Sequence, residues 1–248
     1  MKKSTSSVIA ILLCVVLLVS LAACADADGV GRTSGPDGNT AARESEPEPR
    51  QTEAESEPAE TTEPASAPQE LTASDGAVLV IYFSRTGEQY TVGVIDKGNT
   101  AIVAEMIAEQ TGADLFEVIP ADGHYPMTYD ELTDVAKREQ NEKARPAYTG
   151  SLPDLSHYDT LFIGAPVWWG DWPMILYTVF ENNDFSGKKL IPFSTHEGSG
   201  LSGFDRKLAS ACPDSEILDG LAVRGNDAQN RQESVRNSVN DWLTGLGY

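Results

Sequence analysis

The segment Val78–Thr100 constrains the fold of this chain more than any other. Val78–Phe83 is an unbroken apolar run, which predicts a buried strand, and it leads directly into Ser84-Arg85-Thr86-Gly87. After an insertion comes Gly98-Asn99-Thr100, where a helical pattern begins. A strand that leads through a hydroxyl- and glycine-rich loop into a helix predicts a phosphate site, because backbone N–H groups and the helix dipole attract the anion. The lysine of a P-loop is missing, which argues against a nucleoside triphosphate.

Apolar segments alternate with helical patterns after residue 76, and this order predicts an α/β fold with a doubly wound, five-stranded parallel sheet. We expect the strands at Val78–Phe83, Asp114–Val118, Thr160–Gly164, Lys189–Phe193 and Glu216–Leu221. We expect the helices at Asn99–Gly112, Tyr129–Lys143, from the Trp172-Pro173 step onward, at Leu201–Cys212, and from Asp227 onward.

Three loops are expected at the carboxyl ends of neighbouring strands. They are Ser84–Gly87, Ala165–Pro173 and Ser194–Gly200, and they are rich in glycine, hydroxyl and aromatic residues. In open α/β sheets the ligand binds beyond these strand ends, at the point where the strand order reverses. The composition of the loops suits a planar aromatic ligand with a phosphate tail.

These motifs give the chain a resemblance to flavodoxins over Ala77–Tyr248. More narrowly, it is similar to bacterial flavodoxin-like proteins with YFSR-x-G-E-x-Y, an insertion and then GNT. The Trp168-Trp169-Gly170-x-x-Pro173 element and the Gly198-Ser199-Gly200 loop belong to the same pattern. The resemblance implies strand order 2-1-3-4-5 and non-covalent binding of flavin mononucleotide (FMN).

The resemblance also implies the residues that hold FMN. At the phosphate they are Ser84, Thr86, Asn99 and Thr100; around the flavin ring they are Pro166, Val167, Trp168, Trp169 and Gly170 on one side, and Thr195, Gly198, Ser199 and Gly200 on the other. Arg85, Gly87 and His196 are further candidates in the same loops.

Several roles stay open at this level. Arg85 either neutralises the phosphate or forms a surface ion pair, and His196 either binds the pyrimidine edge of the flavin or lies on the surface. Of the adjacent Trp168 and Trp169, one is expected to point into the core and the other toward the ligand. The insertion Glu88–Gly98 separates the two halves of the phosphate loop, and its Tyr90 either stacks on the flavin or packs on the loop.

The first 76 residues differ in character from the rest. Lys2, Lys3 and the apolar run Val8–Val19 predict an export signal over residues 1–23. Leu21-Ala22-Ala23-Cys24 resembles a bacterial lipobox, which implies lipid on the Cys24 thiol; the alternative is a plain secretory signal. Residues 24–76 are rich in Glu, Pro, Ser and Thr, and we expect a disordered tether, because such a composition buries too little apolar surface to fold.

The net charge and the number of cysteines limit which binding partners, disulfides and metal sites are expected. The net charge is −20, and acidic residues outnumber basic ones by 12 within residues 76–248. This excess argues against nucleic acid and suits either docking to a basic patch on a redox partner or plain solubility. Cys212 is the single cysteine expected in the folded part, so no disulfide and no cysteine-ligated metal are expected there.

The sequence therefore predicts three regions: a signal (1–23), a tether (24–76) and a flavodoxin-like domain (77–248). The expected function is electron transfer through FMN on the extracytoplasmic face of a bacterial membrane, anchored by lipid on Cys24. One alternative is an FMN-dependent NAD(P)H:quinone or nitro reductase, and another is a non-redox binding module on the same scaffold. The identity of the electron donor and acceptor is left open.

Overall fold

The computed structural model describes residues 77–248. The predicted signal, the Cys24 lipidation site and the tether lie outside the described residues. Between residues 77 and 248, no helix combines the length and apolar character that crossing a bilayer requires.

The predicted sheet is present, and its strands run parallel. Its order is β4 (Asp114–Glu117), β1 (Ala77–Tyr82), β5 (Tyr158–Pro166), β6 (Lys189–His196) and then, at the edge, β7 (Glu216–Ile217) with β8 (Leu221–Arg224). Counted along the chain as five strands, this is the expected order 2-1-3-4-5. Leu79 pairs with Leu161, and Leu161 pairs with Leu190, so the central strands end at the same edge.

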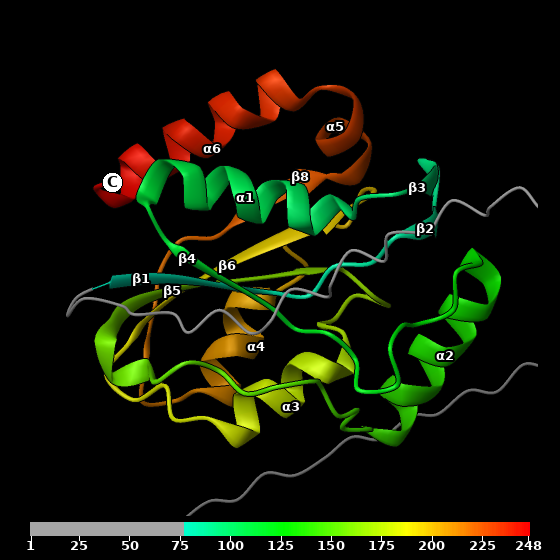
Figure 1. The fold of residues 1–248 in the computed structure, drawn as a ribbon, viewed down its shortest axis with the longest axis horizontal. Coiled ribbons are helices and arrows are strands. Elements are labelled where there is room, and N and C mark those ends of the chain that lie inside the picture. Colours follow the sequence, from blue (N-terminus) through cyan, green and yellow to red (C-terminus); the bar gives the residue numbers. More distant parts are fainter. Residues whose placement is uncertain (1–76) are drawn as a thin grey trace, which may run out of the picture. The chain divides into compact units, whose positions relative to one another are not determined.

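Helices cover both faces of the sheet (Figure 1). α1 (Asn99–Thr111), α5 (Gly225–Asn230) and α6 (Gln232–Leu246) lie on one face, and α3 (Met174–Asn182) and α4 (Phe204–Ala211) lie on the other. α2 (Tyr129–Glu142) lies near the carboxyl ends of the strands, beside a hairpin formed by β2 (Gly87–Gln89) and β3 (Gly93–Ile95). This hairpin occupies the insertion in the phosphate loop, and the sequence pattern did not predict it.

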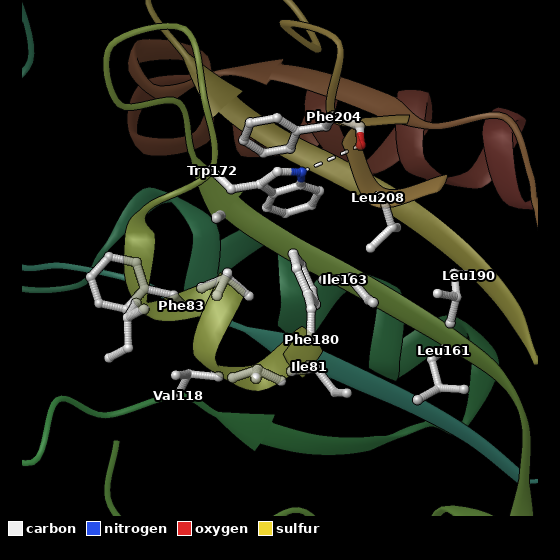
Figure 2. Packing of buried hydrophobic residues seen from close by; sticks show 14 of the residues in the cluster. Ile81, Phe83, Val118, Leu161, Ile163, Trp172, Phe180, Leu190, Phe204 and Leu208 are labelled. Atoms are coloured by element: carbon white, nitrogen blue, oxygen red, sulfur yellow. Dashed lines mark hydrogen bonds between the residues drawn. The ribbon is translucent and has the colours of Figure 1, made fainter. Parts of the chain in front are cut away.

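Alternate residues of β1 point into two separate cores, as its continuous apolar run predicted. Leu79 and Ile81 pack with residues of α3 and α4, whereas Val80 packs with residues of α1 and α6. In the first core, Trp172 is 1% exposed and stacks on Phe204 with 3.6 Å between ring centroids (Figure 2). The indole N–H of Trp172 donates to the backbone carbonyl of Phe204 at 3.3 Å.

Cys212 is buried and belongs to this first core. Burial raises the pKa of its thiol to about 11, because the thiolate would lose its hydration. A thiol that stays protonated and inaccessible is a poor nucleophile, so we assign Cys212 a packing role.

The prediction of one continuous fifth strand at Glu216–Leu221 is wrong in detail. The chain forms two short strands, β7 and β8, and the break lies opposite Pro192 of β6. Proline has no N–H to donate to a neighbouring strand. A Cβ on Gly220 would lie 2.5 Å from the Pro192 carbonyl oxygen, so the backbones also approach closely at this break.

The last predicted helix is also divided. Instead of one helix from Asp227, α5 ends at Asn230 and α6 begins at Gln232, with Arg231 between them at φ −138°. Neither glycine nor proline stands at the break, so no local signal marked it. The break lets the short α5 pack beside the start of α1, close to the predicted ligand loops.

Candidate functional site

A cleft of about 450 Å³ opens where β5, β6 and the first turn of α1 meet. This is the edge of the sheet at which the sequence placed the ligand loops. Of the predicted site residues, those that line the cleft are Asn99, Pro166, Val167, Trp168, Trp169, Thr195, His196 and Ser199. Gly87, Thr100, Gly170, Gly198 and Gly200 lie in the same loops and helix without lining the cleft.

The first turn of α1 retains free donors for an anion. Ser84 Oγ accepts a hydrogen bond from the Ala101 N–H at 3.0 Å, and Gly98 at the N-cap position has no side chain that could cap the helix. The N–H groups of Asn99 and Thr100 precede this bond and have no partner within the helix. Because Asn99 borders the cleft, the positive end of the helix dipole is available to a phosphate there.

Two buried threonines connect the first turn of α1 to strand β6. Thr100 Oγ1 and Thr195 Oγ1 are 2.8 Å apart, and their residues are 1% and 3% exposed. The bond joins the start of α1 to the end of β6, and so it connects two of the elements that border the cleft. We therefore assign Thr100 a role in holding the site together, while Thr195 also lines the cleft.

Ser84, Arg85 and Thr86 line a different cleft, of about 400 Å³, on the other side of the loop. The structure gives Arg85 neither of the two roles expected from the sequence. Arg85 is 8% exposed, and its guanidinium donates to the carbonyl oxygens of Glu88, Pro126 and Thr128 at 2.6–3.3 Å. Burial lowers the pKa of Arg85. Its donors are used to fasten the hairpin to the start of α2, so we assign it a structural role.

The two adjacent tryptophans point in opposite directions, as predicted, and the structure shows which is which. Trp168 packs edge-on against Phe83 and Tyr125, with ring centroids 5.2 and 4.9 Å apart. Trp169 is 54% exposed and faces outward. The chain makes a tight turn here, because Trp168 and Asp171 exchange backbone hydrogen bonds. Trp169 and Gly170 are the two central residues of this turn and have positive φ values of 50° and 73°.

Trp169 connects this turn to α2 across the mouth of the cleft. Its indole N–H donates to the Thr133 carbonyl at 2.9 Å, and its own carbonyl accepts from Gln140 at 3.2 Å. The Lys137 ammonium lies 4.8 Å from the ring centroid, within the range of a cation–π contact. A left-handed conformation is costly for a tryptophan and persists only where surrounding contacts enforce it. These contacts hold the indole as a wall of the cleft.

Sequence reasoning missed one whole side of the cleft. The lining residues that the sequence did not assign to the site are Gln89, Tyr129, Leu132, Thr133 and Ala136, together with Glu197 after β6, whereas Tyr90 of the insertion was one of the residues with two open roles. The spacing of Leu132 and Ala136 marks the buried face of an amphipathic helix, but that signal does not say what the face covers. Tyr90 stacks on Tyr129 with 5.5 Å between ring centroids, so it packs against the start of α2 and also borders the cleft.

Asp171 fixes the position of the tryptophan turn relative to α3. Its carboxylate accepts hydrogen bonds from the Trp172 N–H at 2.8 Å and from the Tyr177 hydroxyl at 2.9 Å, and Lys207 of α4 lies 3.2 Å away. The turn is thus tied to two helices on the same face of the sheet. A ligand that contacts Trp169 meets a positioned side chain and not a free loop.

Comparison with known proteins agrees with this architecture. The sequence profile of the flavodoxin family matches residues 77–242. A candidate flavoprotein from Bacteroides uniformis is 30% identical, covers 68% of this chain and 99% of its own, and superposes with a TM-score of 0.56. A second candidate flavoprotein, from Bacteroides eggerthii, is 26% identical over 70% of this chain and 99% of its own, also with a TM-score of 0.56.

A flavoprotein from Lactobacillus acidophilus, solved in complex with FMN, is more distant. It is 22% identical over 64% of this chain and 99% of its own, with a TM-score of 0.49. No curated protein matches the chain significantly. The family match and the Bacteroides uniformis structure span the described fold and its cleft, and on this basis the chain belongs to the flavodoxin family.

Proposed function

We propose that this chain binds FMN non-covalently in the cleft beside α1 and transfers electrons through it. The observation that carries the proposal is the combination of an open α1 N-terminus with a cleft of about 450 Å³ in a chain of the flavodoxin family. A cleft of this size lies within the range of small-molecule and cofactor sites. The bound flavin would supply one- and two-electron redox chemistry, and the protein would control its binding and surroundings.

The residues of the cleft fit the parts of FMN. The N–H group of Asn99, which lines the cleft, suits the phosphate, because it is uncapped and stands at the positive end of a 13-residue helix. Val167 and the outward indole of Trp169 suit the flat face of the ring, which stacks on apolar and aromatic groups. Leu132 and Ala136 of α2 line the same cleft and would exclude water from the ring.

A reductase of the same fold is the second candidate, and one observation favours it. A reductase needs room beside the flavin for NADH or NADPH, which donates the hydride. If both tryptophans filled the cleft, that room would be missing. Because Trp168 packs against Phe83 and Tyr125, Trp169 is the single exposed tryptophan at the cleft, so the two rings do not both fill it. Oxidation of NADPH or NADH by the FMN-loaded protein distinguishes this enzyme from a pure electron carrier.

The first prediction concerns cofactor binding. Purified full-length protein should bind FMN in the micromolar range or tighter, with quenched flavin fluorescence. Anaerobic photoreduction followed by visible spectroscopy should then show reduction in two separate one-electron steps. A single two-electron step together with NAD(P)H oxidation would favour the reductase. If FMN does not bind at micromolar concentration, both redox functions are wrong and a non-redox binding module remains.

We further propose that the domain acts outside the cytoplasm, held at a membrane by lipid on Cys24. The support is the lipobox-like Leu21-Ala22-Ala23-Cys24 sequence after the apolar run of the signal. Acidic residues also favour a redox partner with a basic surface, and Asp130 and Glu131 at the start of α2 lie next to cleft residue Tyr129.

The second prediction tests the anchor. In a bacterial host that processes lipoproteins, Cys24→Ser should move the protein from the membrane fraction to the soluble extracytoplasmic fraction, because the thiol that accepts the lipid is gone. Mass spectrometry of the N-terminal peptide should detect the lipid in the unchanged protein only. Cys14→Ser, the same substitution inside the predicted signal, should leave the protein in the membrane fraction. Absence of lipid from the N-terminal peptide of the unchanged protein would contradict the anchor.

A further inference from the structure

One carboxyl oxygen in the wall of the cleft has no hydrogen-bond partner. Glu197 follows β6, and its side chain is only 12% exposed. Its Oε1 accepts a hydrogen bond from the Asn226 N–H of α5 at 2.7 Å. Its Oε2 is buried and accepts no hydrogen bond, and within residues 77–248 it is the one side-chain polar atom in that condition. Such an atom is costly in a folded protein unless a ligand or solvent supplies a donor.

Arg224 does not remove this requirement. Its guanidinium Nη2 is 3.5 Å from Glu197 Oε2, which is an ion-pair distance without hydrogen-bond geometry, and the Arg224 side chain is 59% exposed. Solvent weakens an ion pair of this kind. The oxygen therefore has a favourable charge nearby and still lacks an O–H or N–H donor.

His196, the preceding residue, offers the complementary group. Its Nδ1 accepts a hydrogen bond from the Gly198 N–H at 2.8 Å, which places the imidazole proton on Nε2. Burial lowers the pKa of His196, with Arg224 acting in the same direction and Glu197 opposing it, so the neutral ring is favoured. His196 and Glu197 both line the cleft. Together they present one donor, Nε2–H, and one acceptor, Oε2.

The position of Glu197 identifies which part of FMN it would meet. A Cβ on Gly225 would lie 2.3 Å from Asn99 Nδ2 and 2.9 Å from Glu197 Oε1, so these two side chains are neighbours. Asn99 begins α1, where the phosphate is expected, and the flavin ring is expected farther away, against Val167 and Trp169. The segment of FMN adjacent to its phosphate is the ribityl chain, whose hydroxyls both donate and accept hydrogen bonds.

We propose that His196 and Glu197 bind the ribityl hydroxyls of FMN, with a hydroxyl proton donated to Glu197 Oε2 and His196 Nε2–H donated to a hydroxyl oxygen. This inference rests on the proposed function. A hydroxyl satisfies both groups, whereas a phosphate oxygen offers no proton to Glu197. The pair therefore selects a polyol-bearing flavin over one with a plain alkyl chain, and it keeps the phosphate on the α1 side.

The test compares FMN with an analogue in which a 5-phosphopentyl chain replaces phosphoribityl, so that the ring and phosphate are unchanged and the hydroxyls are missing. Full-length protein should bind FMN at least about tenfold more tightly than the analogue, since a buried hydrogen bond to a charged group contributes this much or more. In Glu197→Met, which removes the acceptor at similar length, the preference should fall below about threefold. Glu216→Met, the same change on exposed strand β7, should keep the full preference.

The outcomes separate the inference from the function on which it rests. If neither FMN nor the analogue binds the unchanged protein, the proposed function fails. If both bind equally well, or if Glu197→Met keeps the full preference for FMN, the function stands and the inference is overturned. The comparison of the two ligands on the unchanged protein does not depend on the folding of any variant. ¹⁵N NMR of the histidine ring gives an independent check: a proton on Nδ1 of His196 would also overturn it.

Discussion

Trp172→Ala lowers the free energy of unfolding by about 3–5 kcal/mol, the usual cost of removing a large buried aromatic side chain. The indole is 1% exposed, stacks on Phe204 and packs edge-on against Phe180 with 5.6 Å between ring centroids. Its deletion leaves a cavity between α3 and α4 and removes the bond to the Phe204 carbonyl. Urea unfolding followed by circular dichroism measures the change, and the melting temperature should fall by roughly 6–20 °C.

Trp169→Ala is the matched comparison, because the same indole is deleted from an exposed site. Trp169 is 54% exposed, so its loss should change the unfolding free energy by less than about 1.5 kcal/mol, mainly through the bond to the Thr133 carbonyl. It should instead weaken FMN binding by about tenfold, because the wall of the cleft loses its aromatic face. Equal destabilisation by the two variants would contradict the assignment of Trp172 to the core and Trp169 to the cleft.

The second large effect is expected at Gly98, where the two halves of the phosphate loop touch. A Cβ at this position would lie 2.1 Å from Ser84 Oγ and 2.8 Å from the Arg85 carbonyl oxygen. Gly98→Ala therefore separates Ser84 from the Ala101 N–H that it caps and pushes apart two backbones. Overpacking costs about 1–3 kcal/mol and a lost cap about 1 kcal/mol, so the expected destabilisation is about 2–4 kcal/mol. FMN affinity should fall at least about tenfold, because the first turn of α1 moves with Gly98.

Gly245→Ala provides the control for this prediction. Gly245 lies within α6, its Cβ would meet no atom within 4 Å, and alanine favours the helix. This variant should be more stable than the unchanged protein by roughly 0.5–1 kcal/mol, with unchanged FMN affinity. If Gly98→Ala behaves like Gly245→Ala in both denaturant unfolding and flavin fluorescence titration, the close approach of the two loop halves is wrong.

Much of the scaffold was predictable because its signals are local. The apolar run Val78–Phe83 is buried on both faces of the sheet, and alternate side chains enter two cores without any need to know the partners. α1 begins at Asn99 and is followed by Gly112 in the left-handed conformation, as the glycine after a helical pattern predicted. Alternation of strands and helices was enough to predict the strand order once the family resemblance was added.

The ends and breaks of elements were less predictable, because they depend on residues distant in the sequence. β7 and β8 are separated where their neighbour contains Pro192, and α5 separates from α6 at Arg231 without a glycine or proline. The β2–β3 hairpin is short and leaves Tyr90 and Val94 exposed, so it lacks the apolar alternation by which a strand is recognised.

The sequence by itself determined the fold class, the edge of the sheet at which the ligand loops meet, and half of the residues that line the cleft. The fold class and the edge follow from hydrophobic periodicity and from where loops must lie in a parallel sheet, and the individual cleft residues follow from the family resemblance. Only the tertiary structure decided how side chains are used: it turned Trp168 inward and Trp169 outward, buried Arg85 against backbone carbonyls, and made α2 a wall of the cleft. It also left Glu197 Oε2 without a donor. Such roles depend on partners far away in the sequence, and so no local pattern contains them.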